Sequence, residues 1–288
     1  LVEGSEVSAF LKPELCRRWG LPERVPVAGG AGDNAASAIG MGLVRPGQGF
    51  VSLGTSGVVF VCGARFEPNP AQAVHAFCHA LPASWHQMSV MLSAASALTW
   101  AVKVLGYVDE ADLIRDAASL DASRQARAPL FLPYLSGERS PHNNPHAQAC
   151  WIGMGHAHER ADLAYAVAEG VGFGLRDGLL TPDRSALDSL SLVGGGARSA
   201  WWAQQLAHIL GLRLEVHEGG ELGGALGAAR LGWLAAGGAV EQVCLTPPVA
   251  RSYQPDAEVH ARLLVRHGRF QALYRALAPH FASATRQG

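Results

Sequence analysis

Residues 50–62 read FVSLGTSGVVFVC, two runs of β-prone residues joined by the turn Gly54-Thr55-Ser56-Gly57. A short turn with glycine at both ends, between two such runs, predicts a β-hairpin. The run from Trp85 to Met91 predicts a third strand. The segment from residue 50 to residue 91 is therefore predicted to contribute three strands to a β-sheet.

Further along, residues 190–199 read LSLVGGGARS, an apolar run that ends in three glycines. A helix is expected from Ala200 to Leu210, a strand from Leu212 to Val216 and a helix from Gly223 to Ala235. Strands that alternate with helices after a hairpin predict a mixed α/β class. The other expected helices span 5–19 (ended by Gly20), 35–43, 93–105, 110–120, 160–179 and 257–277, and an apolar run covers 25–28. The breaker sequence RPGQG at 45–49 predicts a domain boundary, which divides 1–47 from 48–288.

Composition excludes several classes of protein. The 288 residues are 49% hydrophobic, too apolar for an intrinsically disordered chain. With 23 basic and 24 acidic residues the net charge is −1, which predicts binding neither to nucleic acid nor to an anionic membrane. The most apolar window, 88–108, is interrupted by serines and a lysine and is a poor membrane span. Five scattered cysteines without a C-x-x-C pair indicate reduced thiols and a cytoplasmic location.

Three glycine-rich turns, at 29–33, 54–57 and 194–196, are candidate phosphate sites, because glycine lets backbone N–H groups approach a phosphate. Any one of them has the simpler interpretation of an ordinary turn. The only lysines, Lys12 and Lys103, do not follow a glycine, so a Walker-type loop is excluded. Ser199 stands where a dinucleotide fingerprint needs its third glycine. A phosphate clamp of the kinase or actin type remains open.

Asp33 follows a glycine-rich turn and precedes a helix. Its carboxylate can act as a base toward a hydroxyl that attacks a phosphate. Taken alone, Asp33 is more simply a helix N-cap, although Asn34 serves that role equally well. The histidine spacings match no zinc motif, and no G-x-S-x-G occurs. The polar segment 132–145 is either a substrate loop or an ordered surface loop with an Arg139 ion pair, and its composition favours the surface loop.

Four motifs occur in the order found in the FGGY carbohydrate kinases: GGAGDNAA at 29–36, SLGTSG at 52–57, PYLSGER at 133–139 and GGGARS at 194–199. The chain resembles that family over essentially its whole length. Residues 74–82, VHAFCHALP, with Trp85 and His86, are most similar to the branch that phosphorylates D-xylulose. A family signature spans 149–170, where Ala168 replaces a larger side chain.

The resemblance implies an actin-like ATPase fold of two domains, in which 1–47 are the tail of the first domain and 48–288 the second. It implies ATP-dependent phosphorylation of a sugar with Mg²⁺ held largely by phosphates and water. Asp33 would be the general base and Asn34 would contact the sugar. Gly54 and Thr55 would contact phosphate. The resemblance assigns contacts with adenosine to Gly195, Gly196 and Ala197. Thr99 and Trp100 have a weaker correspondence to nucleotide neighbours in the family.

The family also has an acidic-glycine-threonine hairpin near its N-terminus, and residues 1–32 contain none. We therefore expect the first domain of the same enzyme to be a partner of this chain, with the sugar and ATP as small-molecule partners. A homodimer is left open. The alternatives are a kinase of the same family acting on another pentose or polyol, and a non-catalytic actin-like module that binds a nucleotide or a sugar.

Overall fold

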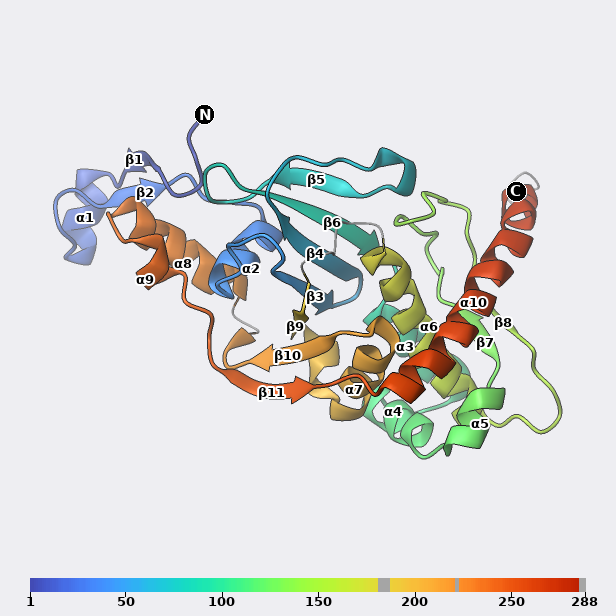
Figure 1. Ribbon diagram of the computed structural model, residues 1–288. Helices are drawn as coiled ribbons and strands as arrows, with labels where there is room; N and C mark the ends of the chain where they lie inside the picture. Colours follow the sequence, from blue (N-terminus) through green and yellow to red (C-terminus); the bar gives the residue numbers. More distant parts are fainter. Residues whose placement is uncertain (181–186, 221–222, 285–288) are drawn as a thin grey trace.

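The computed structural model describes residues 1–180, 187–220 and 223–284. Within these residues, seven strands form a central sheet in the order β11-β10-β9-β3-β4-β6-β5 (Figure 1). The strands are β3 (Gly49–Leu53), β4 (Gly57–Gly63), β5 (His75–Cys78), β6 (Trp85–Met91), β9 (Ser189–Val193), β10 (Arg213–His217) and β11 (Val249–Tyr253). The predicted hairpin, the third strand and the mixed α/β class are confirmed.

The pairing of β3 with β9 matters most for function. β3 pairs antiparallel with β4, whereas β9 pairs parallel with both β3 and β10. Ser52 lies opposite Val193, so β3 and β9 end at the same edge of the sheet. Loops that leave the carboxyl ends of neighbouring parallel strands converge there, which is where ligands bind in open α/β sheets. The 54–57 and 194–196 turns both start at this edge.

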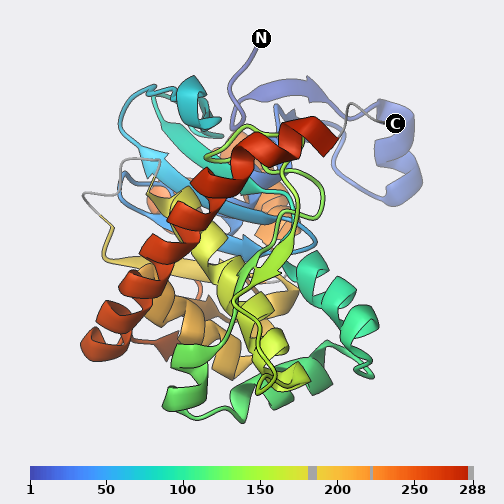
Figure 2. The same cartoon turned by 90° about the vertical axis from the view of Figure 1, so that its right-hand side faces the viewer.

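One face of the sheet is covered by helices. Val51, Val59 and Leu192 pack against α6 (Arg160–Leu179) and α7 (Ala200–Leu210), together with α3 (Ala95–Leu105) and α4 (Glu110–Ala118). An outer layer follows, with α5 (Ala122–Arg127), the ribbon of β7 (Leu130–Leu132) and β8 (Cys150–Ile152), and the long α10 (Ala257–Ala284), which crosses α6 diagonally in Figure 2. The expected bounds of α6, α7 and β6 agree with the structure.

Helix α6 is buried along nearly its whole length because glycines let its neighbours approach closely. A Cβ on Gly172 would lie 2.5 Å from Ile209 of α7, and one on Gly174 would lie 2.8 Å from Met91 of β6. Real Cβ atoms do not come this close to a packed side chain. At Gly170 the atom nearest to an added Cβ is backbone, the carbonyl oxygen of Phe131 in β7, so the position of the helix between the sheet and the outer layer requires glycine there.

On the other face, α2 (Asp33–Gly40) packs against α8 (Gly223–Ala235). Ala35 and Ile39 share a cluster with Leu231 and Leu234 of α8. The antiparallel ribbon of β1 (Val7–Phe10) and β2 (Pro26–Ala28), with α1 (Pro13–Trp19) and α9 (Val240–Val243), extends this unit at the left of Figure 1. A helix that follows the proposed boundary at 47/48 thus packs on one that precedes it.

The expectation of one helix from Ser5 to Trp19 is wrong in its first half. Residues 7–10 form β1, and the helix begins at Pro13. Proline lacks an amide proton and fits the first turn of a helix but not its interior, which explains the start. The stop at Gly20 is confirmed, with a left-handed φ of 65°. The sequence also did not predict β1, β5, β7, β8, β11, α5 or α9.

Two global observations complete the fold. In the part of the chain that the structure describes, no helix is long and apolar enough to cross a membrane. All five cysteines carry free thiols.

Candidate functional site

The two glycine turns at the edge of the sheet touch each other. Gly194 has φ 90°, and a Cβ there would lie 2.6 Å from the carbonyl oxygen of Leu53, the last residue of β3. A Cβ on Gly196 would lie 2.7 Å from the ring of Trp202. Glycine is required at both positions, since any side chain would displace the 3₁₀ turn Gly195–Arg198 from the hairpin.

The hairpin turn is held from behind by the segment between β6 and α3. The amide of Ala95 donates to the carbonyl of Gly54 at 3.0 Å, and the amide of Ala94 donates to the carbonyl of Thr55 at 3.0 Å. The hydroxyl of Ser96 donates to the same Thr55 oxygen at 2.7 Å. The side chains of Thr55 and Ser56 are exposed. The turn thus keeps its carbonyls bound and presents its tip to solvent.

Asp33 is the first residue of α2 and not its N-cap, so the interpretation of Asp33 as a cap is wrong. Gly32 occupies the cap position, without a side-chain bond. One carboxylate oxygen of Asp33 accepts hydrogen bonds from the Asn34 amide at 2.8 Å and from Asn34 Nδ2 at 3.1 Å. The Asp33 side chain is exposed. This carboxylate is therefore oriented by Asn34 and accessible to a ligand.

A cavity of about 310 Å³ lies between α2 and the triple-glycine turn. Ser37, one helical turn after Asp33, lines it together with Gly194, Gly195 and Ala197. The structure therefore brings the helix that carries Asp33 next to the turn predicted to contact adenosine. Within the described ranges, neither Asp33 nor Gly54 nor Thr55 lines this cavity.

A larger cavity, of about 650 Å³, opens on the other side of the same turn. Gly195 and Gly196 line it with Thr99 of α3, whose hydroxyl donates to Glu110 at 2.7 Å. Most of its other lining residues are apolar. Trp100 packs elsewhere, because its ring stacks on Trp151 at 5.1 Å between centroids. Of the two residues with a weaker correspondence, Thr99 lines this cavity and Trp100 does not.

The polar segment 132–145 is not a plain surface loop, and that expectation is wrong. Glu138 is 2% exposed and accepts hydrogen bonds from the amides of Leu92 at 2.9 Å and Arg139 at 2.8 Å. Arg139 lies 3.5 Å from a ring nitrogen of His75 and makes no ion pair within the described residues. Burial and the Arg139 charge lower the pKa of His75. Nothing local in the sequence signals the burial of Glu138.

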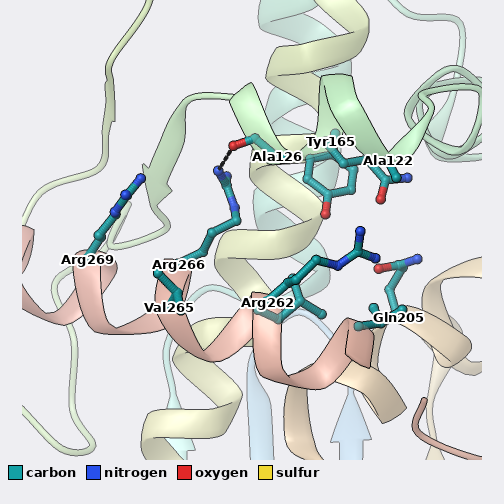
Figure 3. Close-up of a pocket in the computed structure, with 11 residues that line it drawn as sticks. Ala122, Ala126, Tyr165, Gln205, Arg262, Val265, Arg266 and Arg269 are labelled. Atoms are coloured by element: carbon teal, nitrogen blue, oxygen red, sulfur yellow. Dashed lines mark hydrogen bonds between the residues drawn. The ribbon is translucent and has the colours of Figure 1, made fainter. Parts of the chain in front are cut away.

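Two other features lie away from the glycine turns. A cavity of about 280 Å³ separates α10 from α5, α6 and α7 (Figure 3). Arg262 points into it near Tyr165 and Gln205, while Arg266 donates to the carbonyl of Ala126 and pairs with Glu169 on α6. In the described ranges, no group of three or more His, Cys, Asp or Glu side chains is arranged to hold a metal ion.

Comparison of the sequence with known proteins gives consistent results. Residues 49–236 match the family model for the FGGY family of carbohydrate kinases, C-terminal domain. The chain is 48% identical over 283 residues to the xylulose kinase of Escherichia coli K12 and 44% identical to that of Klebsiella pneumoniae. These alignments cover 97% of the chain but 58% of each relative. The chain thus spans little more than half the length of the curated relatives it matches.

Solved structures agree. The crystal structure of a xyloylose kinase from Brucella ovis superimposes with a TM-score of 0.91 at 46% identity, over 97% of this chain and 58% of that one. A glycerol kinase from Plasmodium falciparum shares the fold, with a TM-score of 0.82 at 20% identity over 96% of this chain and 55% of that one. The fold is that of the actin-like ATPases, as the motifs implied. The chain belongs to the FGGY family of carbohydrate kinases.

Proposed function

We propose that this chain is the nucleotide-side part of an ATP-dependent kinase that converts D-xylulose to D-xylulose 5-phosphate. The observation that carries the proposal is the exposed Asp33 carboxylate, on a helix that shares a cavity with a glycine turn built for close backbone approach. The choice of sugar rests on the xylulose kinases of E. coli and K. pneumoniae.

In this proposal Asp33 removes the proton from the terminal hydroxyl of the sugar as that oxygen attacks the γ-phosphate of ATP in line. The Asn34 bond to Asp33 fixes the carboxylate, and Asn34 itself contacts the sugar. Gly54 and Thr55, held from behind by residues 94–96, receive phosphate oxygens at the tip of the hairpin. A positioned base contributes about 10²- to 10⁴-fold to such a rate.

The adenosine is assigned to the triple-glycine turn. Gly195 and Gly196 border the 650 Å³ cavity, whose apolar wall suits a purine, and Ala197 faces the smaller cavity toward α2. Mg²⁺ neutralises phosphate charge when it is bound with ATP. The described residues offer no cluster of three metal-binding side chains, which fits an ion held mainly by phosphates and water.

The remaining part of the relatives' length, about two fifths, would supply the rest of the sugar pocket. In this proposal the partners of the chain are the first domain of the same enzyme, the sugar and ATP. The reaction takes place in the cytoplasm. An actin-like module without catalysis would not need an exposed carboxylate oriented by Asn34, which is why an enzyme is favoured.

The test uses the full-length kinase. Asp33→Ala and Asp33→Asn should lower kcat for D-xylulose by about 10²-fold or more, because the base is lost, while ADP affinity measured by calorimetry changes less than about twofold. Asp121→Asn, a change at an exposed helix N-cap outside both cavities, is the matched control and should retain turnover. Retained turnover in Asp33→Ala would contradict the assignment of the base.

Sugar choice is tested separately. Wild-type enzyme is assayed by ADP release with D-xylulose, other ketopentoses, glycerol and gluconate. The highest kcat/KM is expected for D-xylulose. A higher value for another pentose or a polyol would transfer the proposal to a different kinase of this family.

A further inference from the structure

Glu138 is a buried carboxyl group that no step of the proposed reaction uses. It is 2% exposed, and its Oε1 atom accepts both the Leu92 and the Arg139 amides. Its Oε2 atom is also buried and has no hydrogen-bond partner in the described part of the chain. Burying a carboxyl with one oxygen unsatisfied costs free energy, so its retention calls for a role that a nonpolar side chain would not fill.

The contact with Leu92 leads directly to the hairpin turn. Leu92 opens the bridge 92–96, which consists of the segment between β6 and α3 and the first two residues of α3. Two residues later this bridge donates its amides to the carbonyls of Thr55 and Gly54, at 3.0 Å each, and Ser96 adds its hydroxyl at 2.7 Å. The N-cap of α3, Ala94, has no side-chain cap bond. Glu138 is thus the side chain that fixes the first residue of the bridge.

We infer that Glu138 is a positioning residue for ATP: by holding Leu92 it keeps the bridge 92–96 on the carbonyls of Gly54 and Thr55, so that the tip of the hairpin faces the phosphates. This inference rests on the proposed function, because it takes the 54–57 turn as the phosphate contact. Glu138 itself lies behind the turn and touches no reacting atom.

A carboxylate suits this role better than an amide because bonds to an ionised acceptor are about twice as strong as neutral ones. Burial raises the pKa of Glu138 to about 7, against the two amide bonds and Arg139, while the Asp177 charge on α6 adds to the rise. The neighbouring Tyr134 is buried, and Glu138 contributes to raising its pKa. Protonation of Glu138 near neutral pH would weaken both amide bonds and loosen the bridge.

The simpler possibility is that Glu138 only stabilises the loop 133–145. The two roles differ in what they predict for nucleotide binding. A residue that only anchors the loop affects the stability of the protein and changes the binding of both substrates equally. A positioning residue changes the binding of ATP and not that of the sugar.

The experiment compares Glu138→Gln and Ser96→Ala with Glu169→Gln in the full-length kinase. Glu169 is a matched control, because it is equally buried but pairs with Arg266 on α10, away from the turn. We measure ADP affinity by calorimetry, KM for ATP and for D-xylulose, kcat and Tm. Calorimetry needs no sugar, so it tests the positioning role even if the proposed sugar specificity is wrong.

For Glu138→Gln we expect ADP affinity and KM for ATP to worsen about tenfold, as two charge-assisted bonds become neutral, with KM for D-xylulose unchanged. Ser96→Ala should shift the same two parameters by a smaller factor. Glu169→Gln should lower Tm and leave KM for ATP unchanged. In wild type, KM for ATP should rise as pH falls through about 7, and Glu138→Gln should flatten this dependence.

The inference is overturned if Glu138→Gln leaves ADP affinity and KM for ATP within twofold of wild type, or if Glu169→Gln changes them as much. If Glu138→Gln does not fold, Ser96→Ala decides: an unchanged KM for ATP in that variant overturns the inference. If ADP binds normally but D-xylulose is not phosphorylated by wild type, the proposed function fails while the positioning role is still measured.

Discussion

At the scale of single residues, two histidines behind the hairpin form an unusual buried pair. His79 and His86 are 5% and 4% exposed, and His86 stacks on Phe60 at 4.3 Å between ring centroids. Their rings meet edge-on at 6.0 Å. Burial lowers the pKa of each to about 4, and the mutual repulsion of the two rings adds to the effect for His86. Both imidazoles are therefore neutral in the folded protein near pH 7.

This pair makes stability sensitive to acid. A histidine with a pKa of about 6.5 unfolded and about 4 folded binds its proton more tightly in the unfolded chain. Its contribution is complete above pH 6.5 and is lost as pH falls toward 4. We expect Tm of the full-length protein to fall over this range, and His86→Phe to reduce the slope. His156→Ala, at an exposed position, should leave the slope unchanged. Equal slopes for His86→Phe and wild type would disprove this.

At the scale of elements, the contact between α2 and α8 decides where Asp33 stands. Arg230 of α8 donates to the carbonyls of Ile39 and Gly40 at 2.9 Å each, at the C-terminus of α2. A Cβ on Gly227 would overlap the carbonyl oxygen of Ala36. The two helix backbones are therefore in direct contact, and α2 has little freedom to shift.

Gly227→Ala should push α8 from α2, since backbone cannot give way as a flexible side chain does. We expect a loss of about 1–3 kcal/mol of stability and a fall in kcat, because α2 carries the proposed base. Gly232→Ala, in the same helix with no heavy atom within 4 Å of its added Cβ, should instead stabilise the protein by about 0.5–1 kcal/mol. Denaturant unfolding and steady-state kinetics measure both. Similar effects of the two variants would show that the close contact does not hold α2.

At the scale of the whole molecule, the chain carries both glycine turns and the proposed base but spans 58% of its relatives' length. Asp33 and the tip of the hairpin are exposed. A kinase excludes water by closing two lobes around its substrates, and the exposed base suggests that a further lobe is needed for this.

The 288 residues alone should therefore bind ADP without turning over D-xylulose. Calorimetry with ADP and a coupled ADP-release assay measure the two properties on the same sample. Gly196→Ala should abolish ADP binding, because its Cβ would lie 2.7 Å from Trp202 and 2.8 Å from Leu53. Turnover of D-xylulose by the 288-residue chain at the rate of the full-length enzyme would contradict this expectation.

The amino-acid sequence by itself determined the helices α6, α7 and α8, the hairpin and the need for glycine at its turns. Helical periodicity and turn chemistry depend on residues within about four positions of each other, so both can be recognised from a short stretch of sequence. Asp33 and the triple-glycine turn were likewise predicted as site residues from motifs, and those roles remain predictions. The helix predicted from the sequence was wrong for residues 5–12, because the pairing of β1 with β2 outweighs the local helix preference.

Only the tertiary structure decided that Glu138 is buried, that β3 and β9 end together, and that α2 rests on α8. Each depends on contacts between distant parts of the chain: Leu92 and Glu138 are 46 residues apart, and Arg230 and Ile39 are 191 apart. Burial and pairing of this kind are properties of the packed molecule, since the free energy of a buried group depends on every group around it. The motifs of the site can therefore be recognised in short stretches of sequence, whereas its geometry depends on the packing of the whole molecule.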